Sequence, residues 1–138
     1  MNFDKLSDIK IEVENSSQET GNLPGVIAEI KFALEQLLET KKTHCIDLLA
    51  MPWSPGEEQK LEKYLGQGEV RVELNALGKS TFIESHYSGV WLVSHYDENG
   101  ETIGKLIEIN YLPDMIFSQT EDIRDSLKRL QSIKLNEQ

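Results

Sequence analysis

Apolar residues recur along this chain with two different periods, which separate its helical segments from its extended ones. Between residues 23 and 40 they stand three or four positions apart, which predicts a helix with one broad apolar face. The residues on this face are Val26, Ile27, Ile30, Ala33, Leu34, Leu37 and Leu38. Asn22 is expected to cap this helix, and Pro24 suits its first turn.

Beyond this helix, the apolar positions alternate or run together, as is typical of strands. Five strands are predicted, over residues 44–50, 69–77, 81–87, 90–97 and 102–111. A short helix is predicted between the first two strands, because Ser54-Pro55-Gly56-Glu57 has the form of a capping box. In that motif Ser54 is the expected N-cap, Pro55 the first helical residue and Glu57 the reciprocal partner.

Asn99-Gly100 predicts a two-residue type I′ turn that joins the last two strands into a hairpin. This register places Tyr96 opposite Ile103, Leu92 opposite Ile107 and Trp91 opposite Glu108. Both faces of the hairpin then carry large apolar side chains. One face should pack against helices, and the other is either covered or a docking surface.

A last amphipathic helix is predicted over residues 120–134, with Ile123, Leu127, Leu130 and Ile133 on its apolar stripe. The whole pattern predicts an α+β fold, in which the first and last helices pack on one face of an antiparallel sheet of four to five strands. Residues 23–138 are expected to form a single domain. Residues 1–22 form a polar tail, in which alternating Ile9, Ile11 and Val13 could add an edge strand.

The charge of the chain argues against several classes of function. Its 138 residues carry a net charge of −10, which would repel a nucleic-acid backbone. The sequence contains neither an apolar run long enough to span a membrane nor a secretory signal, so we expect a cytoplasmic protein without membrane contacts. An acidic stretch from Glu84 to Asp114, in which Lys105 is the only base, suits a cationic partner or simply a solvated face.

Residues able to perform catalysis are few. Cys45 is the only cysteine and lies in an apolar run, so we expect a buried, unreactive thiol. His44, His86 and His95 lack the spacing of a metal site, and no cofactor-binding motif is present. We therefore predict a binding protein without metal or cofactor. The alternatives are a small metal- or thiol-dependent enzyme that uses Cys45 with a histidine, or a structural subunit of a larger complex.

Several short motifs resemble, in order and spacing, the C-terminal region of HupH-type hydrogenase expression proteins. They are the segment from Ile46 to Glu57, L-G-x-G-E-V at residues 65–70, G-V-W at 89–91, I-E-I at 107–109, and Pro113. Tyr87-Ser88 stands where that family pattern has an aromatic-proline pair. The resemblance implies a chaperone-like role in the maturation of nickel–iron hydrogenase, through the iron–sulfur small subunit or another maturation factor, without catalysis.

A partner-binding surface is predicted around the two tryptophans, because tryptophan is enriched in interface hot spots. Trp91 shares a predicted sheet face with Glu108, so an aromatic anchor and a charge lie together. Trp53 is the alternative anchor, held in a stiff turn by Pro52 and Pro55. The predicted surface comprises Pro52, Trp53, Glu69, Gly89, Trp91 and Glu108. The alternative is that both rings belong to the core.

Overall fold

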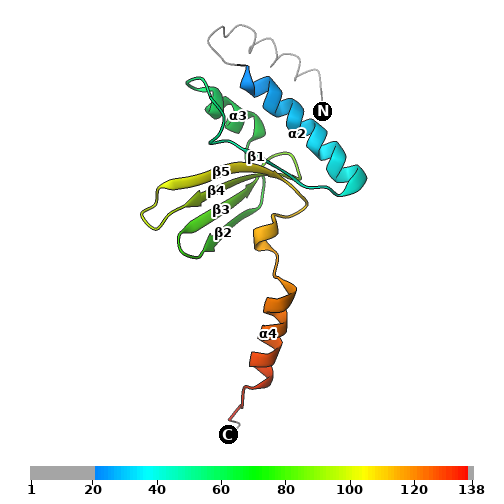
Figure 1. The fold of residues 1–138 in the computed structure, drawn as a ribbon, viewed down its shortest axis with the longest axis vertical. Helices are drawn as coiled ribbons and strands as arrows, with labels where there is room; N and C mark the ends of the chain where they lie inside the picture. Colours follow the sequence, from blue (N-terminus) through cyan, green and yellow to red (C-terminus); the bar gives the residue numbers. More distant parts are fainter. Residues whose placement is uncertain (1–20, 137–138) are drawn as a thin grey trace.

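An antiparallel sheet of five strands organises the computed structural model, which describes residues 21–136 (Figure 1). The strand order is β1-β5-β4-β3-β2. The elements along the chain are α2 (Asn22–Thr40), β1 (His44–Asp47), α3 (Glu57–Leu65), β2 (Arg71–Asn75), β3 (Lys79–Glu84), β4 (Val90–Tyr96), β5 (Thr102–Ile109), the 3₁₀ turn η1 (Asp114–Ile116) and α4 (Thr120–Gln131). The predicted α+β class with an antiparallel sheet is confirmed. The edge strand considered over residues 9–13 lies outside the described residues.

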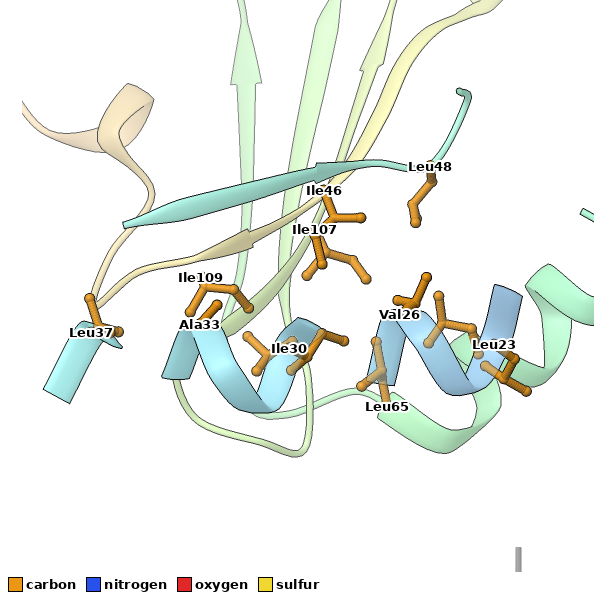
Figure 2. Packing of buried hydrophobic residues seen from close by; sticks show 12 residues of the cluster. Leu23, Val26, Ile30, Ala33, Leu37, Ile46, Leu48, Leu65, Ile107 and Ile109 are labelled. Carbon is orange, nitrogen blue, oxygen red and sulfur yellow. The ribbon is translucent and has the colours of Figure 1, made fainter. Parts of the chain in front are cut away.

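The main core lies between the sheet and the two helices α2 and α3. Figure 2 shows Ile46 of β1 and Ile107 and Ile109 of β5 directed toward the apolar stripe of α2. Leu61 and Leu65 contribute the buried face of α3. The apolar residues at helical spacing on α2 and α3 and those that alternate along β1 and β5 therefore form one buried cluster. This explains why these two helices cover the same face of the sheet.

Glu57 joins the starts of the two helices. Its carboxylate is fully buried; Oε1 accepts a hydrogen bond from the backbone N–H of Ser54 (3.1 Å) and Oε2 accepts one from Leu23 (3.0 Å). The expected caps were wrong, because the N-cap positions are Gly21 and Gly56, both in the left-handed conformation. The reciprocal half of the predicted capping box is present in the bond from Ser54 N–H, and the second bond of Glu57, from Leu23, ties α3 to α2.

The opposite face of the sheet carries a second apolar cluster, built on Phe82, Trp91 and Val93. Leu112 and Ile116, from the segment around η1, pack against it together with Val72, Leu74 and Leu106 of the strands. The prediction that both faces of the β4–β5 hairpin are apolar is confirmed. The second face is covered in part by the chain that leaves β5.

The hairpin register is confirmed from Val90 to His95, including Trp91 opposite Glu108. It is wrong at Tyr96, which pairs with Thr102 across a bulge. The carboxylate of Asp97 accepts hydrogen bonds from the N–H groups of Asn99 (2.8 Å) and Glu101 (2.9 Å). This bonding closes a longer loop with Gly100 at φ 87°, instead of the predicted two-residue turn.

The C-terminal helix α4 does not pack on the sheet, which corrects the prediction. It extends away from the sheet, as Figure 1 shows, and none of its residues is buried. Its amphipathic stripe forms over Ile123, Leu127 and Leu130, but the helix ends at Gln131, before the predicted Ile133, and the side chains on the stripe are exposed. Among the described residues, no helix is long and apolar enough to cross a membrane.

The first predicted strand is also shorter than expected: β1 ends at Asp47 instead of Ala50. It lies at one edge of the sheet. An edge strand pairs on one side only, and here only Ile46 of its four residues is buried. Cys45 is consequently exposed, which contradicts the expectation of a buried thiol. Leu49, expected in the same buried strand, is 53% exposed in the turn that follows.

Candidate partner-binding surface

The two tryptophans lie in different apolar clusters on opposite faces of the sheet. Trp91 is only 3% exposed, and its indole Nε1 donates a hydrogen bond to the backbone carbonyl of Asn110 (3.2 Å). Its ring belongs to the second cluster. Of the two alternatives left open by the sequence, Trp91 therefore takes the core position, and its ring offers no exposed anchor.

Glu108 lies beside Trp91, as the register predicts, but its carboxylate is directed into the protein. Oε2 accepts hydrogen bonds from Asn110 Nδ2 (3.0 Å) and from the backbone N–H of Asp114 (3.1 Å). Asn110 Nδ2 also reaches Asp114 Oδ1 at 3.0 Å. This network fixes the turn from β5 into η1, so the I-E-I motif is explained by the fold of this segment.

The turn between β1 and α3, residues 48–56, is called the Trp53 turn below. Trp53 is half-buried against the main core, and its Nε1 donates to the carbonyl of Leu48 (2.9 Å). Asn22 Nδ2 holds the carbonyl of Pro52 at 3.0 Å. Pro52, Pro55 and Leu49 are exposed on this braced turn, which makes it a stiff apolar surface. Sequence reasoning missed Leu49, since an apolar run alone does not reveal where a strand ends.

A pocket of about 230 Å³ adjoins the Trp53 turn at Leu48. Its apolar lining includes Leu48, Ile83 and Leu92, and its charged lining consists of Glu62 and Lys105. Lys105 Nζ lies 2.5 Å from Glu62 and also 2.5 Å from Glu58. A larger hollow, about 590 Å³, lies between the tips of the β2–β3 and β4–β5 hairpins and contains none of the predicted site residues.

The two carboxylates around Lys105 leave one negative charge beside the Trp53 turn. Partial burial alone would lower the pKa of Lys105, but hydrogen bonds to Glu58 and Glu62 outweigh it and raise that pKa. Lys105 is therefore a fixed cation that joins β5 to α3. The surplus acid favours a partner that presents a positive charge.

Glu69 and Gly89 do not join the Trp53 turn. Glu69 is exposed just ahead of β2. Gly89 has φ 92° in the β3–β4 turn, where a β-carbon would come 3.3 Å from a methyl carbon of Leu34 on α2. The structure thus divides the six predicted residues. Pro52 and Trp53 lie in one turn, Trp91 and Glu108 share one buried network, and Glu69 and Gly89 lie elsewhere.

Cys45 and the histidines form no catalytic arrangement among residues 21–136. Partial burial, followed by the charges of Glu108 and Asp114, raises the pKa of the Cys45 thiol, which disfavours the reactive thiolate. His44 instead contacts Glu29 (2.6 Å), and His95 contacts Ser80 (2.7 Å). Within the same described residues, no group of three or more metal-binding side chains comes together.

Comparison with known proteins places these features in a family. Residues 20–135 match the family model described as the C-terminal conserved region of the HupH hydrogenase expression protein. The chain belongs to the HupH family. A solved structure, the hydrogenase expression protein HupH from Thiobacillus denitrificans, is similar to it with a TM-score of 0.78 and 34% identity, covering 82% of this chain and 94% of that one.

Curated relatives of this HupH-family chain are longer proteins. The hydrogenase expression/formation protein HoxQ of Cupriavidus necator is 29% identical over 112 residues, which are 81% of this chain and 40% of that protein. HoxQ of Azotobacter vinelandii is 26% identical over 123 residues, covering 83% and 44% respectively. This HupH-family chain therefore spans about two fifths of the length of these relatives.

Proposed function

We propose that this chain is an accessory protein in the expression or formation of hydrogenase, and that it acts in the cytoplasm by binding another protein. Membership of the HupH family carries the proposal, because its matched relatives are named hydrogenase expression or formation proteins. The proposed partner is the hydrogenase small subunit, with another maturation factor as the second candidate. The proposed role is chaperone-like and does not involve catalysis.

The Trp53 turn is the proposed contact surface. It presents exposed apolar residues on a backbone that is already held in place by Trp53 and Asn22, so little conformational entropy is lost on binding. The neighbouring pocket can receive one apolar side chain of the partner between Leu48, Ile83 and Leu92. Trp91 is not part of this surface, because its ring is buried.

The charge of the chain supports a cationic partner segment. The net charge is −10. Lys105, which lines the pocket, is paired with two carboxylates, Glu58 and Glu62, and this group carries a net charge of −1. A basic partner segment would be steered toward this surface and would compete with Lys105 for the two carboxylates. This attraction should weaken at high salt, since charges more than about 3 Å apart are screened near molar ionic strength.

Rescue of a cell that lacks the chain tests this function. Hydrogenase activity should be lost without the chain and restored by the wild-type protein. Leu49→Ser should restore it less well, because it removes an exposed apolar contact from the Trp53 turn. Leu77→Ser is the matched control, since Leu77 is 92% exposed at the β2–β3 turn, outside the proposed surface. Normal hydrogenase activity in the absence of the chain would refute the proposed function.

A further inference from the structure

Helix α4 carries an apolar stripe that nothing in the described structure covers. Ile123, Leu127 and Leu130 are 56%, 54% and 67% exposed, and they stand at the i, i+4 and i+7 positions of one helical face. Ile133 and Leu135 continue the apolar character beyond the helix, and Met115 and Phe117 lie before its start. A twelve-residue helix is marginal in water on its own, so its stripe calls for a partner.

The charges of α4 are complementary to those of a second copy of α4 that runs in the opposite direction. Residues 120–126 contain three acids and one base, a net charge of −2, whereas residues 127–136 contain three bases and no acid. Antiparallel pairing brings the acidic half of each helix to the basic half of the other. Parallel pairing would instead place like charges together. Two ion pairs already exist within each helix, Arg124–Glu121 and Arg129–Asp125. They are exposed, so replacing them with pairs between two helices costs little.

The shape of the molecule favours the same arrangement. Figure 1 shows α4 extending away from the sheet, which leaves its sides open along its length. The rest of the chain is strongly acidic, since residues 120–136 carry a net charge of +1 out of a total of −10. Two copies joined by antiparallel α4 helices hold their acidic bodies at opposite ends, roughly the 18 Å length of a twelve-residue helix apart.

We propose that α4 is a self-association element, and that two copies of the chain pair through antiparallel α4 helices centred between Ser126 and Leu127. The apolar ends then also meet, because Ile133 and Leu135 of one copy reach toward Met115 and Phe117 of the other. These exposed side chains offer on the order of 600 Å² per copy, somewhat less than the roughly 800 Å² of a typical interface. The resulting dimer should therefore be weak.

Sedimentation equilibrium of the full chain, from micromolar concentrations to about 0.5 mM, tests the association at the strength expected of a small interface. The wild-type chain should form dimers, and Leu127→Asp should weaken them at least tenfold. Leu77→Asp is the matched control, because it adds the same charge at an exposed leucine far from α4, and it should dimerise as the wild type does. A wild-type chain that stays monomeric throughout, or equal dissociation of both variants, would overturn the proposal.

The antiparallel geometry has a separate test by disulfide cross-linking. In a Cys45→Ser background, Ser126→Cys should cross-link readily to its own copy, since residue 126 lies at the crossing point. Ile123→Cys should not, because the two copies of residue 123 are displaced by about 10 Å along the axis, beyond the roughly 7 Å that a disulfide spans between α-carbons. Ready cross-linking at residue 123 would indicate parallel helices and contradict the proposed arrangement.

Discussion

Replacing Trp91 with alanine gives a quantitative test of its core position. The ring is 3% exposed, packs with Phe82 and Val93, and donates a hydrogen bond to Asn110. Removing a buried aromatic ring costs about 3–5 kcal/mol of unfolding free energy, because both its burial and its contacts are lost. With about 3–5 °C per kcal/mol for a chain of this size, the melting temperature should fall by roughly 10–20 °C.

The substitution Trp91→Phe separates packing from hydrogen bonding. Phenylalanine keeps most of the apolar contact but leaves the carbonyl of Asn110 without the indole donor, so about 1–3 kcal/mol of unfolding free energy should be lost. Urea unfolding followed by circular dichroism measures both variants against the wild type. If Trp91→Ala lowered the unfolding free energy by less than about 1 kcal/mol, the ring would not belong to the core.

Two further predictions concern charged and ionisable groups. Lys105→Met should destabilise the fold by about 1–3 kcal/mol at pH 7, because Glu58 and Glu62 lose their shared cation. The pKa of Lys105 is raised in the folded protein, so the stability from this ion pair is present below the unfolded value of 10.5 and disappears as pH rises through the folded value. Urea unfolding should therefore show the stability difference between Lys105→Met and the wild type shrinking above that pH, and a constant difference would contradict the ion-pair explanation. Alkylation of Cys45 by iodoacetamide should be slow at pH 7 and faster in Glu108→Gln, because removal of a neighbouring negative charge lowers the thiol pKa. An unchanged alkylation rate would exclude that charge effect.

The sequence predicts most of the fold because its local patterns agree with the final packing. The stripe from Val26 to Leu37 forms α2, and the alternation from Val90 to His95 sets the register with β5. Patterns of this kind depend only on which residues share a face. They predict the sheet, its antiparallel class and the two apolar faces.

The errors arise where an element's neighbours decide the outcome. The stripe of α4 looks like that of any helix packed on a sheet, and periodicity does not say whether a partner surface is within reach. Cys45 looks buried in its apolar run, but exposure depends on the edge position of β1. The Asn99-Gly100 turn differs because the carboxylate of Asp97 binds two N–H groups of the loop.

The candidate surface was predictable only in part for the same reason. Trp53 and Trp91 are the same type of residue, yet Trp53 lies half-buried in a braced turn and Trp91 lies inside the second cluster. Leu49 becomes part of the surface only once the end of β1 is known. Of the resemblance motifs, the segment from Ile46 to Glu57 contains the Trp53 turn. The I-E-I motif lies elsewhere, because Glu108 bonds to the backbone of Asp114.

The most direct test of the proposed function is calorimetric titration of purified hydrogenase small subunit into this chain. The account predicts saturable binding that weakens with salt, about tenfold weaker binding by Leu49→Ser, and unchanged binding by Leu77→Ser. These two variants leave the charge unchanged and both replace an exposed leucine, so a difference between them locates the surface at the Trp53 turn. An absence of binding by the wild-type chain would contradict the central claim, and equal binding by all three proteins would place the contact elsewhere.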